Sequence, residues 1–394
     1  MVPLPPTMTE VTVPDCFSPS ALGASARCRL KLVVTSSTRR AEGDERLASG
    51  PEAMVGTVLH RVLDRVEQGD ELSPDEVFQQ EYARAVDELQ RDPRRAHFAD
   101  LASTRSLAEW NRTKQWVLAR ATQQTSPVRP KTAATAGQGS SRLTGPEVGF
   151  QSPTLRLRGK ADSVRQLGSR EFEVRDFKTG VVLDERGEVK SEIELQLWAY
   201  AFMLLERRPG CHVRLVVDDG AEREVAFDAD ARARAKRVLD ELLKGMPPAG
   251  PSTSGELAVP GKGCWGCQVR HVCPAYLAAA PQWWQQYPDG VDRLSNDVWG
   301  TVLDVIGEGR VDVVLRDAAG RRVRIDGLDP RHGLTSVLVG KRVWFFGLEA
   351  TGATRGFDGG RFHPRSFHEL PRDRMERRAW ALHVFVEKET AGGA

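Results

Sequence analysis

The segment 158–180, RGKADSVRQLGSREFEVRDFKTG, constrains the fold and the chemistry of this chain more than any other stretch. Gly159 and Asp162 come first, a β-rich run follows after a Gly-Ser turn, and Asp176 and Lys178 close the segment. The pattern predicts two neighbouring strands, with two carboxylates and one amine at their ends. A divalent metal ion that promotes phosphodiester hydrolysis needs oxygen ligands and a nearby cation, and this segment offers both.

Helical stretches on either side add polar side chains to this candidate site. Residues 191–207 carry Gln196 and Tyr200 four positions apart, which places both on one face of a helix. Upstream, the amphipathic stretch 53–69 carries His60 beside an apolar stripe. A lone histidine in that setting is more often a core or capping residue than a ligand, so the residues alone leave its role open.

The first 282 residues predict helices around a short sheet, which is an α/β fold. Residues 1–17 are expected to be a loose leader, 18–282 one domain, and 128–145 a flexible insertion within it. Helices are expected at 18–34, 53–69, 73–92, 104–125, 191–207 and 228–246, and strands at 147–150, 155–164, 170–180, 212–220 and 222–227.

A second domain, a small all-β barrel of the OB type, is expected at 290–370, because short alternating strands with tight turns follow one another there. The tail 371–394 is expected to be helical or loose. The row Trp344, Phe345 and Phe346 must place at least one aromatic ring on the outer face of its strand. Beside Arg342, Arg355, Arg361 and Arg365, such a ring would suit stacked single-stranded bases. The alternatives are that these rings fill the barrel or pack on the first domain, and that the barrel docks a protein.

The cysteines form a second motif. Cys264, Cys267 and Cys273 lie within ten residues of each other, and Cys28 lies far upstream. Six cysteines with a CxxC pair favour metal ligation over disulfides in a chain of cytoplasmic type. Four thiolates suit a 4Fe–4S cluster or a zinc ion equally well. Cys16 and Cys211 are left over, and Cys211 is expected to be a core residue.

Composition limits the function less than the motifs do. The formal net charge is +2, so charge alone does not argue for a nucleic-acid partner, although a balanced total can hide a basic groove. No apolar run approaches the ~20 residues that span a bilayer. The first residues lack the layout of a signal peptide. A cytoplasmic location without a membrane partner is therefore expected.

Taken together, the motifs resemble the PD-(D/E)XK nuclease superfamily over about residues 17–277. Within it they are similar to RecB-type and AddB-type nuclease domains and to CRISPR adaptation exonucleases. The resemblance implies a restriction-endonuclease-like core with a helical N-terminal part. It implies that His60, Asp162, Asp176 and the Phe177 carbonyl bind Mg²⁺ or Mn²⁺. Lys178 would orient the attacking water, Gln196 and Tyr200 would contact DNA or brace Lys178, and Glu147 would match a further acid of the family or contact nucleic acid.

The cysteine spacing resembles the iron–sulfur branch of the same superfamily. This resemblance implies a 4Fe–4S cluster on Cys28, Cys264, Cys267 and Cys273, acting as a clamp around the nuclease core. One departure is Arg29, because the family often has proline after the first cysteine. No Gly-x4-Gly-Lys-[Ser/Thr] motif of a helicase motor is visible, so the chain is expected to act alone or with a separate helicase or defence partner.

The expected function is a metal-dependent DNA nuclease, most simply a single-strand-preferring exonuclease of repair, recombination or defence. One alternative is a catalytically idle DNA-end-binding or scaffold subunit of a helicase–nuclease complex. A third reading is a zinc-binding adaptor that recruits a helicase.

Overall fold

The structure is a computed structural model, and its residues fall into two compact units. The first unit comprises Met1–Met8, Gly43–Ala121 and Pro260–Ala394, and the second comprises Thr9–Glu42 and Thr122–Val259. The residues that the structure describes are 2–25, 28–37, 46–48, 50–67, 71–95, 114–119, 143–178, 181–264, 267–283, 296–350, 357–364 and 381–388.

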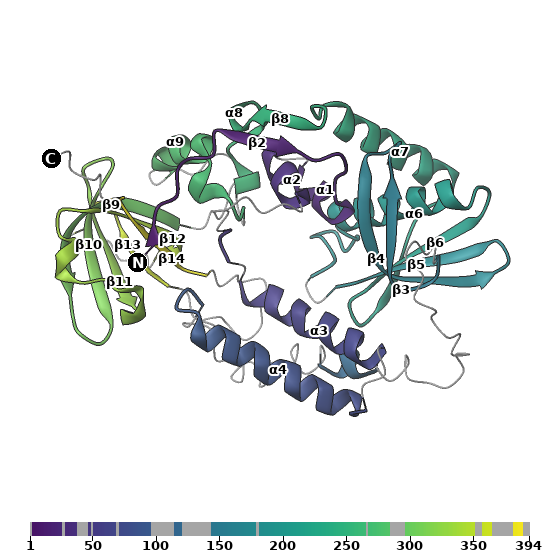
Figure 1. Cartoon of the computed structure of the whole chain (residues 1–394), viewed down its shortest axis with the longest axis horizontal. Coiled ribbons are helices and arrows are strands. Elements are labelled where there is room, and N and C mark those ends of the chain that lie inside the picture. The colour runs from purple at the N-terminus through teal and green to yellow at the C-terminus, as the bar shows by residue number, and fades with distance from the viewer. Residues whose placement is uncertain are drawn as a thin grey trace. The chain divides into compact units, whose positions relative to one another are not determined.

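The second unit is built on a five-stranded sheet of order β3-β4-β5-β6-β7 (Figure 1). Its strands are β3 (Gly145–Ser152), β4 (Leu157–Gly168), β5 (Glu171–Phe177), β6 (His212–Asp218) and β7 (Glu222–Val225). β5 and β6 run parallel and are joined through α6 (Ser191–Arg207), while the other pairs are antiparallel. β5 and β6 are buried almost without alternation, as is typical of strands covered on both faces. This confirms the mixed α/β character that the sequence predicts.

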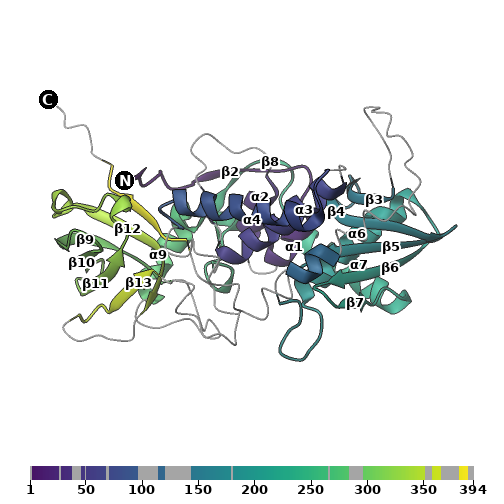
Figure 2. The same ribbon diagram turned by 90° about the horizontal axis from the view of Figure 1, so that it is seen from below.

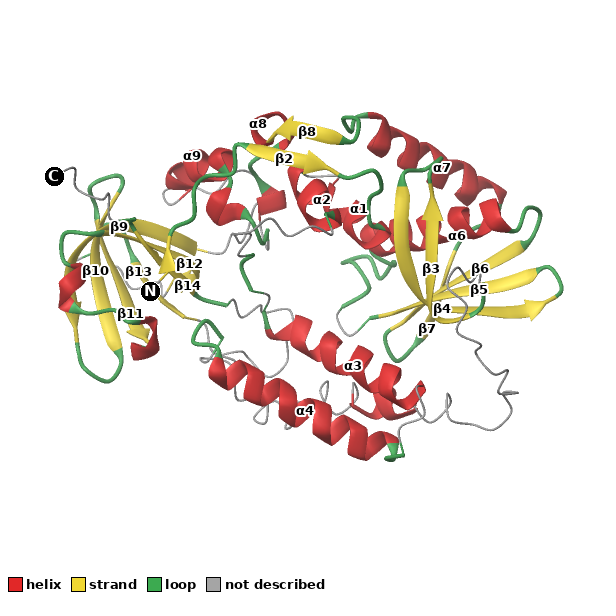
Figure 3. Ribbon diagram, in the orientation of Figure 1, coloured by secondary structure: helices red, strands yellow, loops and turns green. Residues whose placement is uncertain are grey.

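Helices cover this sheet. α6 packs on β3 to β6, and α7 (Ala229–Lys244) packs against α6 (Figure 3). α7 begins where predicted, because the Asp228 carboxylate accepts a hydrogen bond from the Ala231 N–H at 2.8 Å and caps the helix. α1 (Pro19–Ser25) packs closely on α6: a Cβ added to Gly23 would lie 2.2 Å from the Glu192 Cβ.

Two expectations for the N-terminal region are wrong. The predicted helix 18–34 is two helices, α1 and α2 (Arg29–Ser36), because Cys28 has an extended backbone (φ −163°, ψ 112°) that an α-helix cannot contain. The predicted loose leader contains β1 (Val2–Pro3) and β2 (Glu10–Val13), and β2 pairs antiparallel with β8 (Gly250–Thr253). A short helix, α8 (Ser254–Leu257), follows β8.

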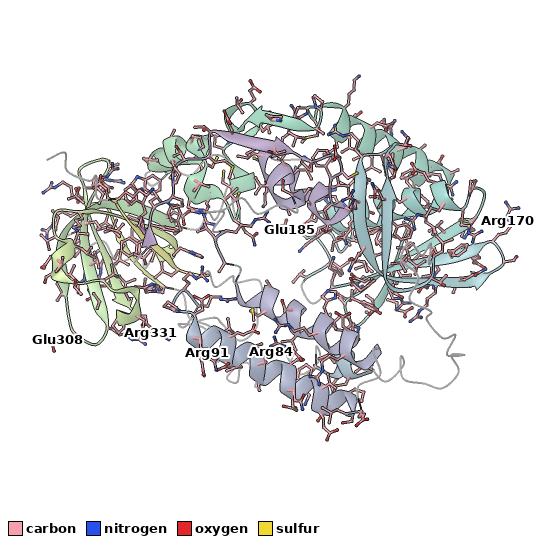
Figure 4. The ribbon with its side chains drawn as sticks, viewed as in Figure 1. Arg84, Arg91, Arg170, Glu185, Glu308 and Arg331 are labelled. Atoms are coloured by element: carbon pink, nitrogen blue, oxygen red, sulfur yellow. The ribbon has the colours of Figure 1, made fainter. Side chains whose placement is uncertain are left out.

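In the first unit, α3 (Pro51–Glu67) and α4 (Pro74–Arg91) pack against each other (Figure 2). α4 opens with a capping box in which Ser73 and Glu76 exchange hydrogen bonds. Figure 4 labels Arg84 and Arg91 on α4, and both make ion pairs within that helix. Of the predicted helix 104–125, residues 114–119 are helical and the others lie outside the described part, as does most of the predicted insertion 128–145.

The rest of the first unit is a cysteine-bearing segment and a barrel. The segment contains the short 3-10 helices η3 (Lys262–Cys264) and η4 (Arg270–Val272) and then α9 (Pro274–Trp283). The barrel strands are β9 (Asn296–Ile306), β10 (Val311–Asp317), β11 (Arg322–Leu328), β12 (Arg342–Ala350) and β13 (Arg361–Pro364).

These five strands close into a ring in the order β9-β10-β11-β13-β12 and back to β9. β11 and β13 are parallel, and the other neighbours are antiparallel. Inward-facing valine, leucine, isoleucine and phenylalanine side chains fill the ring. Gly300 allows β9 to approach β10, because a Cβ there would lie 2.1 Å from the Arg316 carbonyl oxygen. The closed five-stranded ring is compatible with the expected OB-like domain.

The expectation of a helical or loose tail is wrong for its last described part. Residues His383–Val386 form β14, which pairs antiparallel with β12, and β1 pairs parallel with β14. Both ends of the described chain therefore belong to one sheet. Among the helices that the structure describes, none is both long and apolar enough to cross a bilayer.

Candidate active site

Antiparallel pairing of β4 and β5 brings the two predicted aspartates together in the second unit. Ser163 pairs with Arg175, so continuing the register by one residue sets Asp162 opposite Asp176, with both side chains on one face. The Phe177 N–H donates to the Asp162 Oδ2 at 2.7 Å. Asp162 is half-buried, whereas Asp176 is buried.

Lys178, Asp176 and Gln196 form a closed triangle of polar contacts. The Lys178 Nζ lies 2.7 Å from the Asp176 Oδ2 and donates to the Gln196 Oε1 at 3.2 Å. The Gln196 Nε2 completes the triangle by donating to the Asp176 Oδ1 at 2.7 Å. Because 29% of the lysine side chain is exposed against 3% of the aspartate, the amine is the solvent-facing member of the pair.

Tyr200 lies one turn after Gln196 on α6 and donates its hydroxyl hydrogen bond to the Lys160 carbonyl on β4. Burial raises the pKa of Tyr200 well above its usual value, and the nearby negative charges of Asp162, Asp176 and Glu147 raise it further. The hydroxyl therefore stays protonated and keeps its role as a donor to β4.

The glycine of the Gly-x-x-Asp motif has a steric explanation. A Cβ on Gly159 would lie 2.7 Å from the Pro19 Cδ and 3.0 Å from the Tyr200 Oη. Only a residue without a Cβ lets α1 and the tyrosine hydroxyl approach β4 so closely.

Glu147 lies on β3 next to this group. It is exposed and has a left-handed backbone with φ of 46°, which is uncommon for a residue with a Cβ. One of its carboxylate oxygens lies within 4.8 Å of an Asp162 carboxylate oxygen, and the Lys160 Nζ lies 3.6 Å from the Glu147 Oε2. Two carboxylates this close repel each other, and hard oxygen donors of this kind fit a divalent cation.

Sequence reasoning missed the charged network behind β5. The buried Arg175 guanidinium contacts Glu173 at 3.0 Å, Asp218 at 2.8 Å and also Glu222. The Asp218 carbonyl accepts the Lys178 N–H at 3.0 Å, so this network lies at the point where the lysine leaves the sheet. The available signal was opposite charge: the strand 171–177 contains an arginine, and the two strands that follow contain acids.

Three of the remaining predicted residues, His60, Arg342 and Arg361, belong to the first unit. His60 is on α3, in the first unit, so its part in a metal site stays a prediction. Arg342 is exposed and lies over the Trp344 ring at 5.1 Å, and Arg361 pairs with Asp326 at 2.7 Å. Arg355 and Arg365 lie outside the described residues.

Alternation does place aromatic rings on the outer face of β12, as predicted, but these rings are buried. Trp344, Phe345 and Phe346 are exposed by only 9%, 0% and 0%. Alternation does put Phe346 and Phe345 on opposite faces, but Phe346 packs on His271 and Phe385, so the outer face is covered as well. The alternative that these rings are packing residues is the one that the geometry favours.

The candidate cysteine ligands are all buried. Cys28 precedes α2 in the second unit, and its Sγ lies 4.0 Å from the Leu257 carbonyl oxygen. Cys264, Cys267 and Cys273 lie in the first unit and are exposed by 7%, 8% and 8%. The Cys267 N–H donates to the Cys264 carbonyl at 3.0 Å, so the CxxC pair forms a tight turn. The four-thiolate site itself stays a prediction, and the buried leftover Cys211 lies just before β6.

Comparison with known protein families gives a match. No curated protein sequence matches the chain. A family profile described as the PD-(D/E)XK nuclease superfamily matches residues 16–274. The match includes the Asp162–Tyr200 site and all four candidate cysteine ligands and ends before the barrel. Because it covers well over half of the 394 residues, the chain belongs to the PD-(D/E)XK nuclease superfamily.

Proposed function

We propose that this chain is a Mg²⁺- or Mn²⁺-dependent deoxyribonuclease, an exonuclease that prefers single strands. Membership of the superfamily implies a metal-dependent nuclease that hydrolyses phosphodiester bonds. The observation that carries the proposal for this chain is the triangle of Lys178, Asp176 and Gln196 beside Asp162. A carboxylate pair beside a fixed amine suits hydrolysis of a charged ester.

The residues of the triangle and Asp162 each have a distinct part in the proposed chemistry. A divalent cation, when bound, acts as a Lewis acid on a phosphoryl oxygen and lowers the pKa of water. Asp162 and Asp176 supply the hard oxygen ligands that such a cation prefers. Lys178, held by two partners, orients the attacking water and offsets negative charge that builds up around phosphorus. Gln196 keeps the amine beside Asp176.

Further residues complete the proposed site. The Phe177 carbonyl and His60 are proposed as additional metal ligands, and Glu147 as a further acid close to Asp162 or a contact to nucleic acid. Tyr200 is proposed to hold β4, and with it Asp162, in register with α6 through the Lys160 carbonyl. Arg342 and Arg361 remain candidate nucleic-acid contacts on the barrel, which we propose to be OB-like.

For the cysteines we propose a 4Fe–4S cluster on Cys28, Cys264, Cys267 and Cys273 that stabilises the protein. What supports it is the burial of all four thiols and the tight CxxC turn. Four thiolates also suit zinc, so metal analysis of anaerobically purified protein decides between the two. A separate helicase or defence partner is proposed as the source of unwound DNA.

The test is a nuclease assay on single strands labelled at the 5′ or the 3′ end, run with Mg²⁺, with Mn²⁺ and with EDTA. Metal-dependent release of mononucleotides or short products supports the proposal, and the labelled end that disappears first gives the polarity. Asp176→Asn protein is the control for a contaminating nuclease. Binding of DNA ends without any metal-dependent cleavage would refute the enzyme and support an idle end-binding subunit.

A further inference from the structure

A fully buried arginine joins the cysteine-bearing segment to the barrel. Arg270 of η4 donates through Nε and Nη2 to the two carboxylate oxygens of Asp297 on β9, at 2.5 Å and 3.1 Å. The Arg270 side chain is 5% exposed and that of Asp297 is 0% exposed. A bidentate arginine–carboxylate pair is geometrically specific, and removing one partner leaves the other as a buried charge without compensation.

The same aspartate gathers further donors. The Tyr276 hydroxyl of α9 donates to the Asp297 Oδ2, and the Gly347 N–H of β12 donates to its Oδ1 at 2.8 Å. Burial, and then the Asp297 charge, raise the pKa of Tyr276 well above its usual value, so the phenol stays a donor. Asp297 therefore connects η4, α9, β9 and β12. Figure 2 draws α9 next to β12.

The arginine also reaches the cysteines. Its Nη1 donates to the Cys267 carbonyl at 3.0 Å, while its other two nitrogens hold Asp297. The Cys267 N–H in turn donates to the Cys264 carbonyl at 3.0 Å. A continuous path of hydrogen bonds thus runs from the barrel to the CxxC turn.

Aromatic side chains also pack at this junction between the cysteine-bearing segment and the barrel. The His271 ring stacks on Phe385 of β14, with centroids 5.3 Å apart and planes 7° apart, and meets the edge or face of Phe346 at 6.0 Å. Trp299 lies against Phe346 at 6.3 Å. The aromatic face of the barrel is therefore occupied by the cysteine-bearing segment of the same chain.

We infer that the C-terminal barrel holds the cysteine-bearing segment in place, and that Arg270, bound to Asp297, is the positioning residue that fixes the CxxC turn. The part of this inference that concerns metal retention rests on the proposed function of the cysteines. In this arrangement β9 and β12 of the barrel support the proposed metal site. β12 is also the strand that carries the row Trp344, Phe345 and Phe346.

The first test needs no metal. In the metal-free full-length protein, maleimide labelling of individual cysteines is followed by peptide mass spectrometry. Arg270→Lys and Asp297→Asn are expected to label Cys264, Cys267 and Cys273 about tenfold faster than wild type, because local opening exposes the thiols. Labelling of Cys211, in the other unit, should not change.

The matched control is Asp312→Asn. Asp312 also accepts hydrogen bonds from an arginine and a glycine N–H on the barrel, Arg324 and Gly327, but its side chain is 24% exposed. Its loss should leave thiol labelling unchanged. Tyr276→Phe removes one donor to Asp297 and keeps the aromatic ring, so it tests the junction if Asp297→Asn does not fold.

The second test is metal content and the visible spectrum of protein purified without oxygen. Arg270→Lys and Tyr276→Phe should retain less metal than wild type and Asp312→Asn, in folded protein. If wild type binds no metal, the proposed cluster fails and the labelling result alone decides this inference. Unchanged labelling of the three thiols in folded Arg270→Lys and Tyr276→Phe overturns it.

Discussion

Replacing Lys178 by methionine is expected to separate the proposed catalytic role of this residue from metal binding. Methionine keeps most of the length of the lysine but removes the charge that lies 2.7 Å from Asp176. With an effective dielectric constant of about 20, unit charges at this separation attract by about 6 kcal/mol. Hydration of the partly exposed amine reduces the net contribution to about 1–3 kcal/mol.

The attraction between Lys178 and Asp176 determines how the substitution changes metal affinity. The amine neutralises Asp176, so it competes with a cation for the same carboxylate. Its removal should tighten Mn²⁺ binding by about five- to a hundredfold, since about 1.4 kcal/mol corresponds to a factor of ten. The rate should fall by about 10²–10³, because a group that offsets developing charge is lost.

Two measurements check the split. Isothermal titration with Mn²⁺ gives the metal affinity of wild type, Lys178→Met and Asp176→Asn, and a labelled single strand at saturating metal gives the turnover rate. Asp176→Asn should lose both affinity and rate. The reasoning is refuted if Lys178→Met keeps a rate within about threefold of wild type, which would make the lysine a mere ion-pair partner.

Three further perturbations have defined outcomes. Gly159→Ala should lower the free energy of unfolding in urea by about 1–3 kcal/mol, because its Cβ would lie 2.7 Å from the nearest atom. Gly149→Ala on β3 should not, because a Cβ there has no neighbour within 4 Å, and equal losses in the two variants would contradict the steric account. Anaerobic Cys264→Ser protein should be colourless and melt at a lower temperature than brown wild type, and one zinc per chain in wild type would exclude the iron–sulfur cluster. Burial lowers the pKa of His332 from 6.5 to about 4, so the folded state loses stability as pH falls from 6.5 towards 4. His332→Gln should therefore flatten the pH dependence of the melting temperature in that window. Parallel curves of melting temperature against pH for wild type and variant would show that this histidine does not contribute.

How much of the molecule is readable from sequence depends on how local each determinant is. The strands around Asp162 and Asp176 were predictable because a turn, a β-rich run and strand alternation all lie within 158–180. The capped start of α7 and the capping box of α4 were predictable for the same reason.

The errors come from partners that lie far away in sequence. Strand β14 is only four residues long, and it forms because β12 and β1 pair with it. The burial of Phe346 depends on His271 and Phe385, which no pattern within β12 announces. A charged residue such as Arg175 can enter a buried strand only because Asp218 and Glu222 arrive from β6 and β7 to pair with it.

The way the chain divides between its two units sets an order for its synthesis. The second unit needs nothing beyond Val259, so its sheet has all its strands once that residue has left the ribosome. The first unit includes Met1–Met8 but also needs β14, so β1 waits for a partner that is made almost last. The sheet that carries Asp162 and Asp176 can therefore form early, whereas Arg270 meets Asp297 only later. A nascent chain would hold the completed sheet of the second unit before Cys264, Cys267 and Cys273 reach their final positions.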